Sequence, residues 1–240
     1  MEIVHQEHAV EARHRGPNLG ALSVVYTGLF LASLAITAVM TRGEHFPSPF
    51  VSPEVAQEFF AMNANVVRLS AFLQFGAAVP LGIFAATAAS RLRFLGVNVA
   101  GVFIALFGGI AASLFAAASA LFQWVLAQPG IPSHVEITRI LHLLSFATGG
   151  VGYTVPFGLL VAGVSVIAWF MKLLPSWLAW LGLVIAGVAE LSSLSLVFTP
   201  LAYLLPAARF PGFVWMIAAG YLLPRSRVEA RRTRVWPSAA

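Results

Sequence analysis

Long apolar runs alternate with short polar or proline-rich stretches along most of the chain. A helix needs about 20 apolar residues to cross a hydrocarbon core of about 30 Å, and each run reaches that length. The pattern predicts an all-α, polytopic membrane helix bundle with about six transmembrane helices, at residues 19–40, 59–89, 94–126, 137–170, 177–198 and 201–223. The third and fourth runs exceed one crossing, so we expect their ends to tilt or to project from the bilayer.

Prolines mark two of the breaks in this pattern. Three prolines between residues 47 and 53 prevent a helix from continuing beyond the first run. In the last run, Pro206 and Pro211 leave two interpretations open. Either one short helix begins near Ala207, or residues 201–208 form a separate interfacial piece.

The apolar runs define one transmembrane domain over residues 19–223, with a polar end on each side. Residues 1–18 form a polar arm, and residues 224–240 form a basic tail that we expect to be loosely ordered. We expect no cleavable signal peptide, because the first apolar run is too long for a signal h-region and resembles a signal anchor.

The composition supports a membrane location and excludes several kinds of chemistry. The chain has 240 residues, of which 59% are hydrophobic and 10% are charged, whereas a soluble domain carries about a quarter charged residues. The sequence has no Cys and no Asp, so thiolate metal sites and a Ser-His-Asp triad are excluded. No zinc, Walker or dinucleotide motif occurs, so the sequence predicts no catalytic residue, no metal, no cofactor and no nucleic-acid partner.

The basic residues indicate an orientation. With the N-terminus inside, ten of the 14 basic residues fall on the inner side and three on the outer side, namely Arg42, Arg139 and Arg209. Arg68 falls within the second run. Because cytoplasmic loops are enriched in Lys and Arg, both termini are expected to be cytoplasmic, in a plasma (inner) membrane.

Two parts of the chain share an order of motifs. A V-P-x-G motif occurs at residues 79–82 and 155–158, and an L-G-x3-A-G-V motif follows each, at residues 95–102 and 181–188. This order fits a parallel repeat of two helical hairpins. The alternative is chance, since proline and small residues recur in membrane helices.

One acid and one base fall within the apolar runs. Arg68 lies about 14 Å deep if the second run is entered from outside, and Glu190 lies about 20 Å deep if the fifth is entered from inside. Both depths fall in the outer half of the bilayer, where an unpaired charge costs about 2.5 to 3.5 kcal/mol. Opposite charge at similar height predicts an ion pair between Arg68 and Glu190.

Other polar residues are predicted to surround this pair in the outer half of the bilayer. They are Asn65, Gln123, Arg139, His142 and Ser193. One interpretation is a structural ion pair with satellite hydrogen bonds that fixes the helix register. A second is an outward-facing polar pocket that binds a ligand or relays protons. The third is that the groups never meet.

Three stretches resemble a known family. They are NxxRLS at residues 65–70, FGLLVAG at 157–163 and LPSWLAWLG at 174–182. They resemble a bacterial family of multi-pass membrane proteins known only as a domain of unknown function (DUF4386-like), with an arginine early in the second span and an LPxWLGxLG-like entry to a late span. The chain departs from that pattern at Trp180. The resemblance implies a fold over residues 19–223 and a bacterial plasma membrane, and it implies no activity.

Several function classes remain after this reasoning. The first is a membrane protein that binds a small amphipathic or lipid-like ligand in the outer pocket. The others are an accessory or structural subunit of a membrane complex and a proton-coupled small-solute transporter. An enzyme is the weakest, for want of a nucleophile–base pair. The expected partners are membrane lipids, a small amphipathic ligand, and a second copy of the chain or a membrane partner subunit.

Overall fold

The computed structural model describes residues 13–44, 46–50 and 52–235. Most of the arm predicted over residues 1–18 lies outside this part. The helices, in chain order, are α1 (Leu19–Met40), α2 (Pro53–Met62), α3 (Ala64–Phe94), α4 (Ala100–Leu126), η1 (Ile131–Ser133), α5 (Val135–Ala147), η2 (Thr148–Gly152), α6 (Tyr153–Met171), α7 (Ser176–Leu191), η3 (Ser192–Leu196), η4 (Thr199–Tyr203), α8 (Leu204–Leu222) and α9 (Arg227–Val235). Within the described ranges there is no strand, and one isolated β-bridge joins Arg13 to Ser226.

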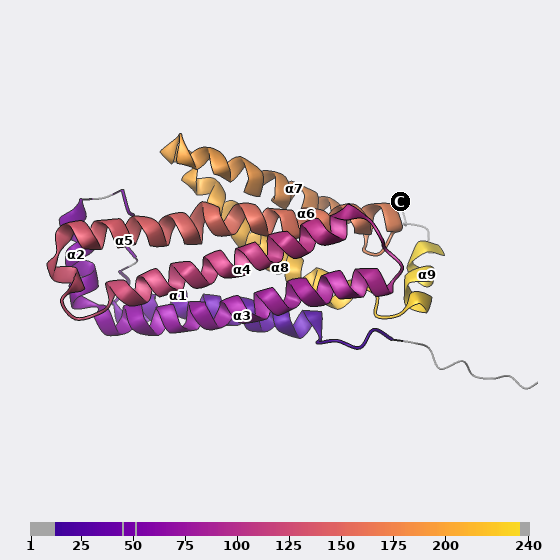
Figure 1. Cartoon of the computed structure of the whole chain (residues 1–240), viewed down its shortest axis with the longest axis horizontal. Helices are drawn as coiled ribbons and strands as arrows, with labels where there is room; N and C mark the ends of the chain where they lie inside the picture. The colour runs from indigo at the N-terminus through magenta and orange to yellow at the C-terminus, as the bar shows by residue number, and fades with distance from the viewer. Residues whose placement is uncertain (1–12, 45, 51, 236–240) are drawn as a thin grey trace, which may run out of the picture.

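Among the described residues, six segments are long and apolar enough to cross a membrane. They are α1, α3, α4, the continuous run α5–η2–α6, α7 with η3, and η4 with α8. They lie roughly along one long axis, with α2 at one end and α9 at the other (Figure 1). The predicted all-α, multi-pass membrane bundle is therefore confirmed.

The first predicted span matches α1 at both ends. The Asn18 side chain caps the helix, accepting hydrogen bonds from the backbone N–H of Gly20 at 3.0 Å and of Ala21 at 3.4 Å. The second predicted span is wrong at both ends. Its first residues belong to α2, which Asn63 separates from α3, and α3 continues to Phe94.

The last span is not interrupted at its prolines: the 3-10 segment η4 leads into α8, which contains both Pro206 and Pro211. Pro206 stands in the first turn of α8, where the helix needs no N–H donor, and Pro211 lies inside the helix. A proline inside a membrane helix is tolerated when neighbouring groups satisfy the freed backbone. The part of the chain after Pro224 is also more regular than expected, because it forms α9.

Two segments far apart in the sequence, residues 13–18 and 224–227, lie side by side at the α9 end of the bundle. The N–H of His14 donates to the Arg225 carbonyl at 2.8 Å, and the His14 ring lies 3.0 Å from the Ser90 hydroxyl. Burial, together with nearby Arg91, lowers the pKa of His14 and so favours its neutral form. The basic residues at this end are Arg13, Arg15, Arg91, Arg93, Lys172, Arg225, Arg227 and Arg231, and those near α2 are Arg42, Arg68 and Arg139.

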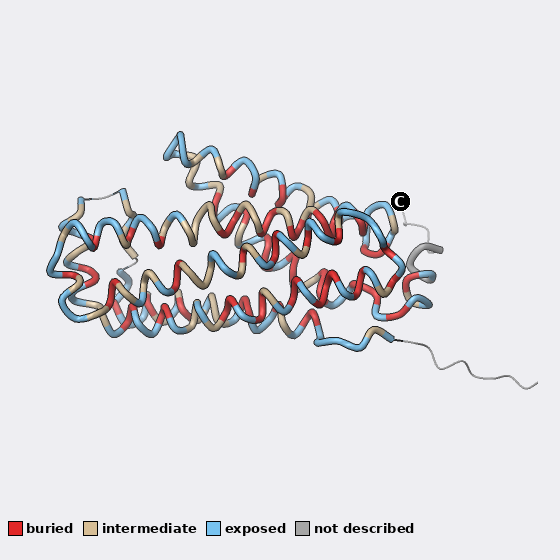
Figure 2. Tube along the Cα trace, in the orientation of Figure 1, coloured by how far each residue is buried: buried red, intermediate tan, exposed pale blue. Residues whose placement is uncertain are grey.

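The core is concentrated toward the α9 end (Figure 2). There α4 and α6 pack at backbone contact, because the facing positions are glycine and alanine. A Cβ added to Gly163 would lie 2.6 Å from the Gly101 carbonyl oxygen and 2.8 Å from the Ala105 Cβ. Membrane helices use small residues in this way to bring their backbones together.

Trp215 joins three helices in the same core. Its side chain, on α8, is fully buried, and its indole N–H donates to the Leu178 carbonyl of α7 at 3.0 Å. Gly182 of α7 leaves the space for it, since an added Cβ would lie 2.5 Å from the indole nitrogen and 2.0 Å from the Ser165 hydroxyl of α6. The indole therefore holds α8 against α7 and α6.

The two L-G-x3-A-G-V motifs occupy different structural positions. Gly96 lies in the turn between α3 and α4 with φ +89°, whereas Gly182 lies inside α7 beneath Trp215. The motif therefore does not mark equivalent positions in the fold.

Candidate functional site

The half of the bundle near α2 contains a partly open cavity of about 420 Å³. Its walls come from α1, α3, α4, α5, η2, η4 and α8, with Phe60 of α2, Tyr153 of α6 and the 46–49 segment. This volume falls within the range of small-molecule sites, about 300 to 1,000 Å³. Fewer residues are buried in the half of the bundle near α2 than in the half near α9 (Figure 2).

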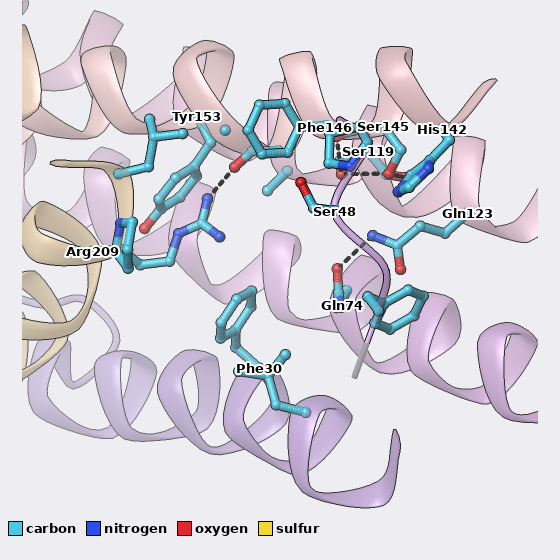
Figure 3. A pocket seen from close by; sticks show the side chains of 18 of the residues that line it. Phe30, Ser48, Gln74, Ser119, Gln123, His142, Ser145, Phe146, Tyr153 and Arg209 are labelled. Atoms are coloured by element: carbon cyan, nitrogen blue, oxygen red, sulfur yellow. Dashed lines mark hydrogen bonds between the residues drawn. The ribbon is translucent and has the colours of Figure 1, made fainter. Parts of the chain in front are cut away.

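Arg209 carries the one permanently charged side chain among the described residues that line this cavity. One terminal nitrogen of its guanidinium donates to the Gly149 carbonyl of η2 (Figure 3). The guanidinium carbon lies 4.2 Å from the centre of the Tyr153 ring and 5.2 Å from that of Phe30. These cation–π contacts and the hydrogen bond fix the guanidinium in place.

No carboxylate balances this charge in the described part of the chain. The lining residues include no acid, and the ion pair formed within 4.0 Å is Arg13 with Glu229, far away at the α9 end. The Nε of Arg209 is buried and has no hydrogen-bond partner among the described residues. A buried donor without a partner costs free energy, so the described residues do not satisfy all the donors of this guanidinium.

The segment η2 makes this arrangement possible. It is a π-helical turn between α5 and α6 with the sequence TGGVG, so three of its five residues lack a side chain. A Cβ on Gly149 would lie 2.4 Å from the Ser119 hydroxyl of α4. The glycines therefore let α4 approach and leave the Gly149 carbonyl open to Arg209. Such π-helical turns occur often at functional sites.

Two tyrosines lie beside Arg209 at the same end of the cavity. The hydroxyl groups of Tyr26 and Tyr153 are 2.5 Å apart, and both rings are buried. The Tyr153 ring stacks on Phe157 at 5.4 Å. This pair connects α1 to α6, and the Tyr153 ring supports the guanidinium.

A second polar group lies at the opposite end of the cavity (Figure 3). The side-chain amide nitrogen of Gln123 donates to the side-chain Oε1 of Gln74 at 3.0 Å. The Oε1 of Gln123 is buried without a partner among the described residues. His142 is buried there with its ring edge-on to Phe60. Ser119 donates to the Ser145 carbonyl at 2.8 Å. These groups are neutral, so the cavity is charged at one end only.

Apolar and aromatic side chains form most of the remaining wall. Phe30 and Phe146 lie between the two polar ends (Figure 3). The 46–50 segment covers one side, with Phe46 against Phe59 and Phe60 and with Phe50 edge-on to Phe146. The result is an apolar space with a few polar groups, which is the usual form of a small-molecule site.

The structure brings together only some of the predicted site residues. His142 and Gln123 line the cavity. Arg68 is exposed and donates to Asn65, and Arg139 is exposed on α5. On α7, Glu190 is exposed, and the hydroxyl of Ser193 donates to its carbonyl at 2.6 Å.

The predicted ion pair between Arg68 and Glu190 is not formed, because the two residues lie at different heights. At 1.5 Å per residue the 26 residues from Arg68 to Phe94 cover about 39 Å, measured from the α9 end. The 14 residues from Ser176 to Glu190 cover about 21 Å from the same end. The prediction assumed that the second span begins at residue 59 and is one bilayer thick, and α3 meets neither condition.

Sequence reasoning missed Arg209, Tyr26 and Tyr153. It counted Arg209 as an outer surface charge, because Pro206 and Pro211 appeared to interrupt the helix around it. The available signal was a single arginine within an apolar run, which in membrane proteins marks a functional position by default.

The cavity has a volume that would admit a small molecule. No group of three His, Asp or Glu side chains that could hold a metal ion occurs in the described ranges. A comparison with family models, with curated proteins and with solved structures finds no match for this chain.

Proposed function

We propose that this membrane protein binds a small amphipathic, lipid-like molecule in the cavity around Arg209. The observation that carries the proposal is a partly open, mostly apolar pocket of about 420 Å³ with one fixed cation at one end and uncharged hydrogen-bonding side chains at the other. A wholly apolar molecule would leave those polar groups unsatisfied, and a strongly polar one would not match the aromatic wall.

The charge distribution supports a cytoplasmic α9 end in a plasma membrane. Eight of the basic residues named above lie near α9 and three near α2, which is the asymmetry that the positive-inside rule expects. With that orientation the cavity opens within the outer half of the bilayer. Arg209 follows the start of α8 by five residues, or about 8 Å, a depth near the polar boundary of the membrane.

A second candidate function is a subunit of a larger membrane complex. The observation in its favour is Glu190, which is exposed on α7 and whose carboxylate has no partner among the described residues. It lies near Gly187, where an added Cβ would meet nothing within 4 Å. Exposing a carboxylate to the hydrocarbon of the membrane costs free energy, unless a polar group on another helix pairs with it. A transporter is less favoured, because the half near α9 is filled by an apolar core. Membership of the DUF4386-like family is compatible with either function.

Filling the cavity is expected to abolish binding. Ala116 lines the cavity, and Ala116→Phe would place a ring inside it. The matched control is Leu114→Phe on the same helix, because Leu114 is 65% exposed. We expect native mass spectrometry of protein incubated with laurate or dodecanol to show one bound molecule for the wild type and the control, and none for Ala116→Phe.

A second variant separates blocking from misfolding. Ala202→Phe fills the cavity from η4, outside the bundle core, and should give the same loss. The proposal is contradicted if both cavity variants bind at wild-type occupancy, or if the wild type binds neither compound. The same spectra report the number of chains, so a larger assembly without bound amphiphile would favour the subunit function.

A further inference from the structure

We infer that the ligand of this cavity carries an anionic head with oxygen acceptors, a carboxylate or a phosphate, and that Arg209 binds it. This inference rests on the proposed function and adds the charge of the ligand. It follows from the contrast between the cation in the cavity and the lack of any acid among the described residues that line it.

The first step is the state of the Arg209 charge. An arginine stays protonated under all ordinary conditions. In most buried sites a carboxylate balances such a charge, but here the contacts of the guanidinium are a backbone carbonyl and two aromatic rings. These contacts orient the group without neutralising it. An anion is therefore the ligand that this site stabilises most.

The second step is the geometry of the free donor. The guanidinium presents its donors in a planar fork that matches the two oxygens of a carboxylate or phosphate. One terminal nitrogen is held by Gly149, and the buried Nε has no partner. The guanidinium therefore keeps donor capacity that Gly149 does not use, and Arg209 lines the pocket in which an oxygen acceptor would lie. A cationic ligand would be repelled, and a neutral alcohol would offer one weaker acceptor.

The third step is the rest of the molecule. Phe30, Leu34 and Phe146 line the space next to Arg209, so the part of the ligand beyond the head is hydrocarbon. At the far end the unpartnered Oε1 of Gln123 can accept a hydrogen bond, but it adds no charge. The site thus fits a monoanionic amphiphile better than a zwitterion, because no acid is present to pair with a second, positive group.

The test compares ligands that differ only in the head. Direct binding of radiolabelled laurate, dodecyl phosphate, dodecanol and dodecylamine is measured by scintillation proximity on the full chain in nanodiscs of phosphatidylcholine. We expect the two anions to bind roughly 10- to 100-fold more tightly than the alcohol, the range for hydrogen bonds to charged groups. The amine should bind most weakly. The ratio of laurate to dodecyl phosphate distinguishes the two anionic heads.

The same binding measurements on variants of Arg209 test the role of this residue. Arg209→Gln should remove most of the difference in affinity between laurate and dodecanol, and Arg209→Lys should restore part of the preference for the anion. Equal binding of laurate and dodecanol to the wild type would overturn the inference and leave the proposed function in place. A laurate preference that survives in Arg209→Gln would overturn the role of Arg209. Binding of none of the four compounds would refute the proposed function itself.

Discussion

Replacing Gly163 with leucine is expected to destabilise the bundle by about 3 kcal/mol, the upper part of the range for overpacked sites. The reason is the backbone contact between α6 and α4, where even a Cβ would lie 2.6 Å from the Gly101 carbonyl oxygen and 2.9 Å from the Ala105 nitrogen. Both atoms belong to the helix backbone, so no side-chain rotation relieves the clash and the helices must separate.

The matched control is Gly28→Leu on α1, because nothing lies within 4 Å of a Cβ at that position. We expect its melting temperature, followed by size-exclusion chromatography after heating in detergent, to stay near that of the wild type. Gly163→Leu should melt far lower or fail to accumulate in the membrane. Similar melting of the two variants would show that α4 and α6 do not pack at backbone contact.

Replacing Trp215 with alanine is expected to cost about 3 to 5 kcal/mol, the range for removing a buried large aromatic side chain. The change leaves a cavity between α6, α7 and α8. It also removes the indole N–H that donates a hydrogen bond to the Leu178 carbonyl. Trp215 and Arg209 lie on the same helix, less than two turns apart. A looser α8 should therefore also weaken laurate binding.

Trp177→Ala is the control for this change. Trp177 is 61% exposed at the start of α7, so its loss should alter neither the melting temperature in detergent nor laurate affinity by much. If Trp215→Ala and Trp177→Ala have the same melting temperature, then the Trp215 indole does not hold α8 in place. If it melts lower but binds laurate normally, then the position of Arg209 does not depend on the packing of α8 in the core.

The fold could be predicted from the sequence because its main signal is local. Hydropathy and length define a membrane span without knowledge of its neighbours, and Asn18 marks the start of α1. The boundary at Asn63 could not be found in this way. Apolar residues continue from α2 into α3, so hydropathy does not show where one helix ends and the next begins.

The site was predictable only in part because its residues are brought together by packing. His142 and Gln123 were identified as polar groups in apolar runs, and both line the cavity. The contact between Tyr26 and Tyr153 joins residues 127 positions apart, and no pattern along the chain indicates it. The depth of Arg68 was misjudged because residues were counted against one bilayer thickness, whereas α3 has 31 residues.

The most direct test of the account is to map where an amphiphile sits. Laurate with a diazirine at the end of its chain is photolysed with the full protein in nanodiscs, and the labelled peptides are identified by mass spectrometry. We predict adducts on cavity residues such as Phe30, Leu34 and Phe146, removed by excess unlabelled laurate and absent in Ala116→Phe. Adducts confined to exposed positions on the outside of the bundle, such as Phe107 and Phe170, and unaffected by competition, would contradict the account.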